Sequence, residues 1–342
     1  MKQVRVHGAG RYEIDDVSAP QMAADDAIIQ MGACGICGSD IHFVHGGVLR
    51  PDGAPMPLGH EAAGVVLSAG ANAVGVEPGM RVFINPMGDP TNIIGNGGSE
   101  GAFAPEVLVR NARLGENLLP VPDGLPLEHA ALVEPLAVGL HGVNRGNPKA
   151  GSKVAVFGCG PIGLGAVLWL ARLGANPIVA IDVSEGRLRL ARELGAHATI
   201  NPLKENLRDR LMELHGRGRP ALGEEAVGTD VFYDMAGGRT VIQDILSLAQ
   251  FQARLVVTAV YLEPLPMDMM QILTRELELT AAIGYPTELH DVLRLLPEID
   301  PSLLNAYISH RYAFEQFDEA FATAQTAESA KVMVMFNEAS RH

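Results

Sequence analysis

Cysteine, histidine and glutamate side chains recur in three short segments of the first 140 residues. The segment Cys37-Gly-Ser39-Asp-Ile-His42 is followed by His60 and Glu61, eighteen residues after His42, and Glu134 comes later. A catalytic zinc ion is usually held by three protein ligands of these types, and a fourth position stays open to water or substrate. Cys37, His60 and a carboxylate from Glu61 or Glu134 could therefore supply such a site.

A second stretch that could do chemistry covers residues 154–182. It contains an apolar run, the turn Gly158-Cys-Gly-Pro-Ile-Gly163, a further apolar segment, and a second apolar run that ends on Asp182. Glycines at this spacing between a strand and a helix let the backbone approach a pyrophosphate, which the free N–H groups of the helix then bind. An acidic residue about 20 positions further on accepts the ribose hydroxyls of NAD and repels the 2′-phosphate of NADP.

The same stretch could also be read as a membrane-spanning helix. Residues 154–171 carry no charge over 18 positions, which is close to the lower length limit for a span. Four glycines and a proline between Gly158 and Gly165 argue against a membrane helix and suit the strand–turn–helix unit. The residues that we expect to bind NAD are Gly158, Gly160, Pro161, Ile162, Gly163, Asp182 and Arg187.

Each candidate metal ligand also has a purely structural interpretation. Cys34 and Cys37 form a CxxC pair, which some proteins use for redox chemistry, but no second pair accompanies it. His60 alone would be an ordinary polar histidine, and Glu134 could simply begin a helix with its charge near the positive end of the helix dipole. Their occurrence together in one chain favours the metal site.

Composition limits the class of protein and its partners. The 342 residues are enough for about two domains. Lysine and arginine total 26 against 40 aspartates and glutamates, and the net charge of −14 argues against nucleic acid and membranes as partners. The N-terminal segment lacks the apolar core of a signal peptide, and three cysteines cannot build a disulfide framework. We therefore expect a soluble, cytoplasmic protein.

The candidate residues must be positioned by two kinds of structure. Short alternating runs separated by glycine and proline predict a β-rich domain over residues 1 to about 110. From about 150 to 285, strands alternate with helical segments such as 184–195, which predicts a doubly wound parallel sheet. After residue 285 we expect helices near 288–296 and 315–324 and a strand over 331–336, folded back onto the first domain. Residues 267–279 are expected to form an edge strand.

Taken together, the motifs resemble those of the zinc-dependent medium-chain dehydrogenase/reductase family. The segments beginning at Cys37, Gly59, Glu134 and Gly158 occur in the family's order across essentially the whole chain. The last two are most similar to the polyol, butanediol and idonate dehydrogenase branch. The resemblance implies an α/β protein with a β-rich GroES-like catalytic domain over 1–147, completed by 286–342, and a Rossmann NAD-binding domain over 148–285.

The resemblance also implies the reaction and the ligands. It places Cys37, His60 and Glu134 around one zinc ion, with Glu61 close enough to bind it directly or through water. A hydride passes between a secondary alcohol and NAD. Whether the third protein ligand is Glu61 or Glu134 stays open.

Three polar residues near Cys37 have supporting roles in this interpretation. Ser39 takes the proton of the alcohol, and His42 passes it towards solvent. Asp40 is expected to accept a hydrogen bond from the second ring nitrogen of the ligand histidine.

The sequence departs from the family in one segment. Many members carry a lobe in which four closely spaced cysteines bind a structural zinc, whereas residues 85–101 contain no cysteine. We therefore expect one catalytic zinc per chain and no structural zinc. The lobe should be held by packing alone or be loose.

Other functions remain as alternatives. A non-catalytic NAD-binding or regulatory protein would not need the metal ligands, and a reductase of activated double bonds would need no zinc. A zinc alcohol dehydrogenase for simple or aromatic alcohols would share them. The sequence does not give the alcohol, the stereospecificity or the direction, although Phe43, Asn85, Ile93 and Tyr285 are candidate pocket residues. The resemblance implies a homodimer or homotetramer.

Overall fold

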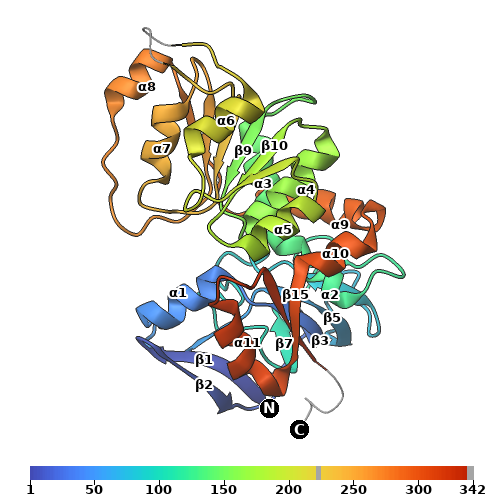
Figure 1. Ribbon diagram of the computed structural model, residues 1–342. Helices are drawn as coiled ribbons and strands as arrows, with labels where there is room; N and C mark the ends of the chain where they lie inside the picture. The colour runs from blue at the N-terminus through green and yellow to red at the C-terminus, as the bar shows by residue number, and fades with distance from the viewer. Residues whose placement is uncertain (221–224, 337–342) are drawn as a thin grey trace. The chain divides into compact units, whose positions relative to one another are not determined.

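A computed structural model describes residues 1–220 and 225–336. The chain divides into two units, of which unit 1 contains Met1–Glu134 and the segment from Leu289 onward, and unit 2 contains Pro135–Glu288. Unit 1 contains two sheets and unit 2 contains one (Figure 1). Each unit has its own hydrophobic core.

Unit 1 is built mainly from β-strands, as predicted. Its larger sheet has the order β15-β16-β3-β5-β6-β8, with β7 paired to β3, and its smaller sheet has the order β2-β1-β4. The strands are β1 (Lys2–Gly8), β2 (Arg11–Asp16), β3 (Ala27–Gly35), β4 (Met56–Pro57), β5 (Glu61–Ala69), β6 (Arg81–Ile84), β7 (Glu106–Val109), β8 (Leu118–Pro120), β15 (Ile308–Ala313) and β16 (Lys331–Met335). The helices are α1 (Gly38–Gly46), α2 (Leu127–Ala130), α9 (Glu288–Leu295), α10 (Pro301–Tyr307) and α11 (Phe317–Ala324), and α3 (Val133–Gly146) continues into unit 2.

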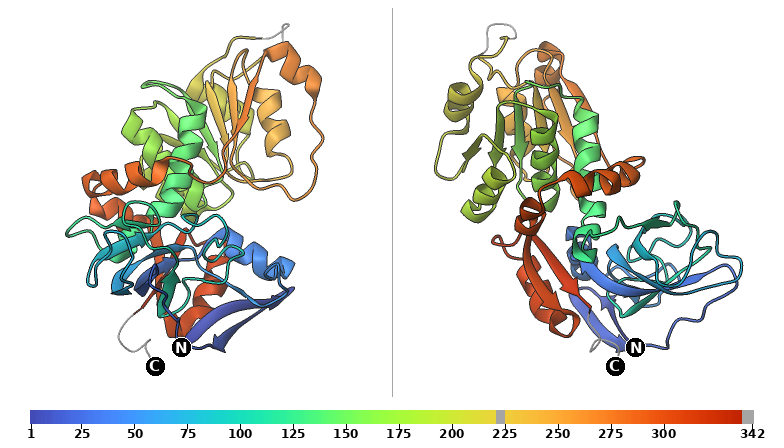
Figure 2. Two further views of the ribbon diagram at one scale, coloured as in Figure 1. Left: turned by 180° about the vertical axis from the view of Figure 1, so that it is seen from behind. Right: turned by 90° about the vertical axis from the view of Figure 1, so that its right-hand side faces the viewer.

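Segments from both ends of the sequence complete the core of unit 1. Strand β16 lies between β15 and β3 in the sheet, so late and early residues are neighbours (Figure 2). Helix α11 packs beside them through Phe317, whose ring centroid is 4.9 Å from that of Phe103. Both phenylalanine side chains are fully buried, and burying an aromatic ring of this size is among the largest single contributions to a core.

The expectations for the segment after residue 285 are confirmed in part. Helices α9 and α11 and strand β16 lie within a few residues of the predicted ranges. The sequence reading missed α10 and β15. Three of the six residues of β15 are serine, histidine and arginine, and buried and exposed side chains do not alternate along the strand. The alternating pattern that would predict a strand is therefore absent.

Unit 2 is a doubly wound α/β structure. All five strand pairings in its sheet are parallel, in the order β11-β10-β9-β12-β13-β14. Helices flank both faces of this sheet (Figures 1 and 2). The strands are β9 (Val154–Phe157), β10 (Ile178–Ile181), β11 (Ala198–Ile200), β12 (Val231–Asp234), β13 (Arg254–Val257) and β14 (Glu278–Ala281). The helices are α4 (Pro161–Leu173), α5 (Glu185–Glu193), α6 (Leu207–His215), α7 (Val241–Leu248) and α8 (Met269–Arg275).

The charge-free stretch 154–171 forms a strand and a helix. It contains β9 and most of α4, which has 13 residues. Among residues 1–220 and 225–336, no helix has the length and apolar character needed to cross a membrane.

The prediction of one edge strand over residues 267–279 is wrong for most of that range. Residues 269–275 form helix α8, because Asp268 accepts hydrogen bonds from the backbone N–H groups of Met270 and Gln271 and so caps the helix. Strand β14 begins only at Glu278 and does lie at the edge of the sheet.

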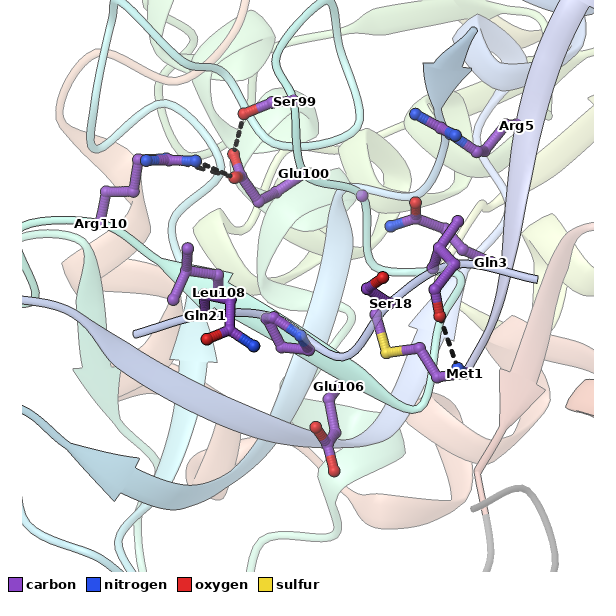
Figure 3. A pocket seen from close by; sticks show the side chains of 13 residues that line it. Met1, Gln3, Arg5, Ser18, Gln21, Ser99, Glu100, Glu106, Leu108 and Arg110 are labelled. Carbon is purple, nitrogen blue, oxygen red and sulfur yellow. Dashed lines mark hydrogen bonds and ion pairs between the residues drawn. The ribbon is translucent and has the colours of Figure 1, made fainter. Parts of the chain in front are cut away.

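The cysteine-free lobe at residues 85–101 is held by hydrogen bonds, so the expectation of packing alone or looseness is wrong. Asn92 accepts hydrogen bonds from the backbone N–H and the hydroxyl of Ser99, at 2.8 and 3.1 Å. Glu100 accepts from the Ser99 hydroxyl at 2.7 Å, and Arg110 donates to the other carboxylate oxygen at 2.7 Å (Figure 3). Polar side chains thus connect the lobe to Arg110, which directly follows strand β7.

Candidate active site

Three of the four candidate metal ligands of unit 1 lie at the ends of two paired strands, and the fourth, Glu134, is in the first turn of α3. Gly35 of β3 is opposite Glu61 of β5, and this register brings the residues that follow β3 beside those that precede β5. One ligand atom from each of Cys37, His60 and Glu61 lies within 4.8 Å of the other two. The structure thus assembles three of the four predicted ligands, and Glu134 lies outside this 4.8 Å group.

Asp40 organises the backbone of this cluster. Its carboxylate accepts hydrogen bonds from the backbone N–H of Cys37 at 2.9 Å and of Gly59 at 3.3 Å. Its distance to the Nδ1 atom of His60 is 3.6 Å, which is longer than a hydrogen bond. The predicted hydrogen bond from the histidine ring is therefore not formed, and Asp40 acts on His60 through its charge.

The electrostatics of the cluster favour a bound cation. Burial alone would lower the pKa of His60, but the charges of Asp40 and Cys37 raise this pKa well above its usual value. Burial raises the pKa of the Glu134 carboxyl to about 7, and the neighbouring Glu61 adds to the increase while His60 opposes it. Removing negatively charged groups from water is costly unless a positive charge compensates them.

One polar atom of the cluster and the neighbouring Glu134 carboxyl have no hydrogen-bond partner in the described part of the chain. The Nδ1 atom of His60 is buried and makes no hydrogen bond. The Glu134 side chain is 7% exposed, and its carboxylate has no hydrogen bond or ion pair to any residue that the structure describes. Sulfur, imidazole nitrogen and carboxylate oxygen are the donor set of a catalytic zinc site. The residues present therefore fit a zinc ion.

Lys331 belongs to the same site and was missed by the sequence reading. Its Nζ atom lies 2.6 Å from both carboxylate oxygens of Glu61 and 3.0 Å from the carbonyl oxygen of Ile36. The Lys331 and Glu61 side chains are 1% and 0% exposed. Burial alone would lower the pKa of Lys331, but the charge of Glu61 raises it, so the ammonium group stays charged. Glu61 is thus already paired with a cation.

The two predicted proton-relay residues lie on helix α1. The Ser39 hydroxyl is 3.3 Å from the Nε2 atom of His60. His42 is exposed and comes three residues later, on the same face of the helix. A path from the cluster through Ser39 and His42 would therefore lead to solvent.

Two of the candidate pocket residues have other contacts. Phe43 packs against the core of unit 1, and Asn85 donates a hydrogen bond to the Glu116 carbonyl.

Unit 2 contains a cavity of about 590 Å³ at the carboxyl ends of its central strands. This edge, where the strand order reverses, is the usual binding place of a parallel α/β sheet. The cavity is lined by Phe157, Gly158, Gly160, Ile181, Asp182, Val183, Arg187, Pro202, Leu203, Leu207, Met235, Ala236, Gly238, Thr240, Val241 and Asp244.

The glycines of this cavity are required by its geometry. Gly158 has a φ of 92°, and a Cβ atom there would lie 2.8 Å from the backbone of Ala236. A Cβ atom on Gly163 would lie 1.8 Å from the carbonyl oxygen of Gly158. Gly160 is the N-cap of α4 and offers no side-chain cap, and Pro161 is the first residue of that helix. The first-turn N–H groups of α4, beginning at Ile162, are thus left for a phosphate.

Asp182 is held firmly at the end of β10. One carboxylate oxygen accepts a hydrogen bond from the backbone N–H of Cys159 at 2.7 Å, and the other accepts from that of Ser184 at 2.8 Å. Each oxygen keeps a lone pair for a ribose hydroxyl. Arg187, one helical turn further on, lines the same cavity. Cys159 is fully buried, and burial raises the pKa of its thiol, as expected for a residue that only fills space.

The sequence matches two family descriptions. Residues 23–123 match the alcohol dehydrogenase GroES-like domain, and residues 161–298 match the zinc-binding dehydrogenase domain. Sorbitol dehydrogenase of Rattus norvegicus is 30% identical over 96% of this chain and 94% of its own. An (R,R)-butanediol dehydrogenase of Bacillus subtilis is 30% identical over 87% of this chain and 88% of its own.

Solved structures agree with the sequence matches. The crystal structure of 2R,3R-butanediol dehydrogenase from Bacillus subtilis superposes with a TM-score of 0.87, at 28% identity, and covers 98% of this chain and 99% of that one. A zinc-binding dehydrogenase from Sinorhizobium meliloti, bound to NADP, superposes with a TM-score of 0.83 at 29% identity, over 98% of both chains.

Proposed function

Since the chain belongs to the zinc-dependent medium-chain dehydrogenase/reductase family, we propose that it oxidises a secondary alcohol of the diol, polyol or sugar-acid class with NAD. The observation that carries the proposal is the group of half-buried Cys37 and buried His60 and Glu61. The buried Glu134 carboxyl is near enough for the charges of His60 and Glu61 to shift its pKa. Its relatives act on sorbitol and on butanediol. The dinucleotide cavity of unit 2 supplies the second half of such an enzyme.

Cys37, His60 and Glu134 would hold the zinc ion. Lys331 already neutralises Glu61 through both of its oxygens, which leaves Glu134 as the carboxylate without a partner among the described residues. When bound, zinc supplies Lewis acidity, which lowers the pKa of an alcohol towards neutrality.

The side chains of the protein then handle the proton. The Ser39 hydroxyl, within 3.3 Å of His60, can accept the alcohol proton and donate its own. His42 is exposed, so it can pass the proton to water. Lys331 is a positioning residue, because it fixes the carboxylate of Glu61 without contacting solvent.

A panel of small diols, polyols, sugar acids and simple or aromatic alcohols with NAD tests this proposal. We expect one or more vicinal diols or polyols to give a kcat/KM within the ordinary enzymatic range, which begins near about 10⁴ M⁻¹s⁻¹. Preference for a simple or aromatic alcohol would correct the substrate class. NAD binding with no turnover of any alcohol would instead support a regulatory protein on the same fold.

Cofactor choice gives a second prediction. We expect NAD to be preferred over NADP by more than about tenfold in kcat/KM, because a 2′-phosphate would face the fixed carboxylate of Asp182. Two unit charges about 4 Å apart repel by about 4 kcal/mol at an effective dielectric of 20, and screening leaves about half of that. Asp182→Ala should weaken NAD use and narrow the difference between the cofactors.

The matched control for this prediction is Asp182→Asn, which removes the charge and keeps one oxygen acceptor. It should narrow the difference between NAD and NADP with a smaller loss of NAD use. A protein from Sinorhizobium meliloti with a similar fold is bound to NADP, so the preference of this protein between NAD and NADP has to be measured. Equal or better use of NADP by the wild type would show that the Asp182 carboxylate does not face the ribose.

We also propose that the protein forms a homodimer or homotetramer through the edge of the unit 2 sheet. Strand β14 is at that edge, and Leu273 of α8, Leu279 of β14 and Ile283 beyond it are 70%, 46% and 90% exposed. Exposed apolar side chains beside an unpaired strand edge are typical of an interface between copies.

Replacing Leu279 with glutamate tests this interface. Two such charges would face each other near a two-fold axis, so we expect the variant to dissociate to monomers in light-scattering measurements at micromolar concentration. Leu67→Glu is the control, because Leu67 in β5 is 47% exposed and lies in unit 1. A monomeric wild type would refute the assembly.

A further inference from the structure

We propose that Asp244 recognises the exocyclic amino group of the adenine of the cofactor and so selects adenine over hypoxanthine. This role rests on the proposed NAD-dependent function. It concerns the end of the unit 2 cavity that lies beyond the glycines and Asp182 and would hold the adenine base.

The cavity fixes where the base must lie. The pyrophosphate belongs at Gly158 and Gly160, beside the start of α4, and the adenosine ribose belongs at Asp182. The base therefore extends beyond Asp182, away from the glycines. The remaining residues that line the cavity include Leu203, Leu207 and Val241. Their apolar side chains suit the faces of a flat purine ring.

Asp244 is an uncommitted acceptor in this cavity. It lies in the first turn of α7, half-buried, and it lines the cavity together with Val241. Its backbone is engaged, since its N–H donates to Thr240 at 2.8 Å and its carbonyl accepts from the Ser247 hydroxyl. Within residues 1–220 and 225–336, its carboxylate has no hydrogen bond or ion pair.

The other acidic groups nearby are already occupied. Asp182 accepts two backbone N–H groups. Asp234, at the end of β12, accepts hydrogen bonds from the Tyr261 hydroxyl at 2.5 Å and from the N–H groups of Ala236 and Gly237 at 3.1 Å. Asp182 keeps its remaining lone pairs for the ribose, so Asp244 is the acid of this region whose carboxylate accepts no hydrogen bond from the described residues and is left for the base.

A carboxylate at this place can distinguish a base that carries a hydrogen-bond donor at position 6 from one that carries an acceptor there. An ionised carboxylate can only accept hydrogen bonds, and adenine offers the N–H donors of its 6-amino group. Hypoxanthine carries a carbonyl oxygen at the same position, which would repel the carboxylate. Because Asp182 anchors the ribose, the base cannot slide to present its ring N–H instead.

Fluorescence titration with NADH and with reduced nicotinamide hypoxanthine dinucleotide tests the inference. We expect the wild type to bind NADH about tenfold more tightly, which corresponds to one hydrogen bond to a charged acceptor. Asp244→Ala should reduce this ratio to about twofold or less, mainly by weakening NADH binding. Asp209→Ala is the matched control, because Asp209 is an exposed acid in the first turn of α6 and does not line the cavity.

The outcomes separate this inference from the proposed function. Equal affinity of the wild type for the two dinucleotides, or an unchanged ratio in Asp244→Ala, would overturn the role of Asp244 and leave the NAD-dependent function intact. An equal loss of affinity for both dinucleotides in Asp244→Ala would show a general effect of charge and would also overturn it. Failure of the wild type to bind NADH at all would refute the proposed function, and the inference with it.

Discussion

Replacing Lys331 with methionine is expected to lower the free energy of unfolding of the metal-free protein by about 3–5 kcal/mol. Lys331 and Glu61 are 1% and 0% exposed, so the variant would leave a carboxylate buried without a counter-charge. We also expect kcat/KM to fall by about tenfold or more, because the released Glu61 could compete for the metal with Glu134 or with the substrate. Urea unfolding in the presence of a chelator and steady-state kinetics measure the two effects.

Two further variants make the Lys331 prediction specific. Lys331→Arg keeps a positive charge and should lose less stability than the methionine variant. Combining Lys331→Met with Glu61→Gln removes both charges, and the double variant should be more stable than Lys331→Met alone. If Lys331→Met unfolds at the same urea concentration as the wild type, the buried ion pair does not contribute as proposed.

Replacing Cys37 with alanine is expected to remove the metal and reduce turnover by about a thousandfold or more. The Lewis acidity of the metal lowers the activation free energy by several kcal/mol, and each 1.36 kcal/mol changes the rate by about a factor of ten. Elemental analysis should give about one zinc per wild-type chain and almost none for the variant. Treatment of the wild type with a chelator should have the same effect on activity while its circular dichroism stays unchanged, since both cores are apolar and contain none of the candidate ligands.

Cys34 supplies the control for this experiment. It is fully buried in β3, three residues before Cys37, and is not a member of the metal-ligand group. Cys34→Ala should therefore keep both the zinc and most of the activity. Two zinc ions per wild-type chain, or full activity after the metal has been removed, would contradict the single catalytic site.

The nucleotide site was the most predictable part of the protein. Its glycines, the start of α4 and Asp182 lie within 25 consecutive positions. The contact that requires glycine at position 163 is with Gly158, inside that segment, whereas the one at position 158 is with Ala236. Local sequence therefore carries the information for the proposed phosphate and ribose subsites, whereas the rest of the cavity lining comes from residues 202–244.

The parts that sequence reading missed depend on distant contacts. Lys331 precedes an apolar run and has the appearance of an exposed residue, while its partner Glu61 is 270 positions away. Because its cysteines are missing, the lobe was expected to be held by packing alone or to be loose. Its polar residues Asn92 and Glu100 look like ordinary loop residues in the sequence, and only the fold brings them to Ser99 and Arg110. Helix α8 was mistaken for a strand because its apolar side chains face solvent, contrary to the usual helix pattern.

The position of β16 within the sheet also affects the order in which the protein can mature on the ribosome. Strand β16 pairs with β3 and carries Lys331 to Glu61, but it is translated after the whole of unit 2. The nascent chain can thus complete unit 2 first, while the emerging half of unit 1 holds an uncompensated Glu61 and an open strand edge on β3. During synthesis, this half of the protein therefore exposes an unpaired strand edge, which favours aggregation, until β16 has been made.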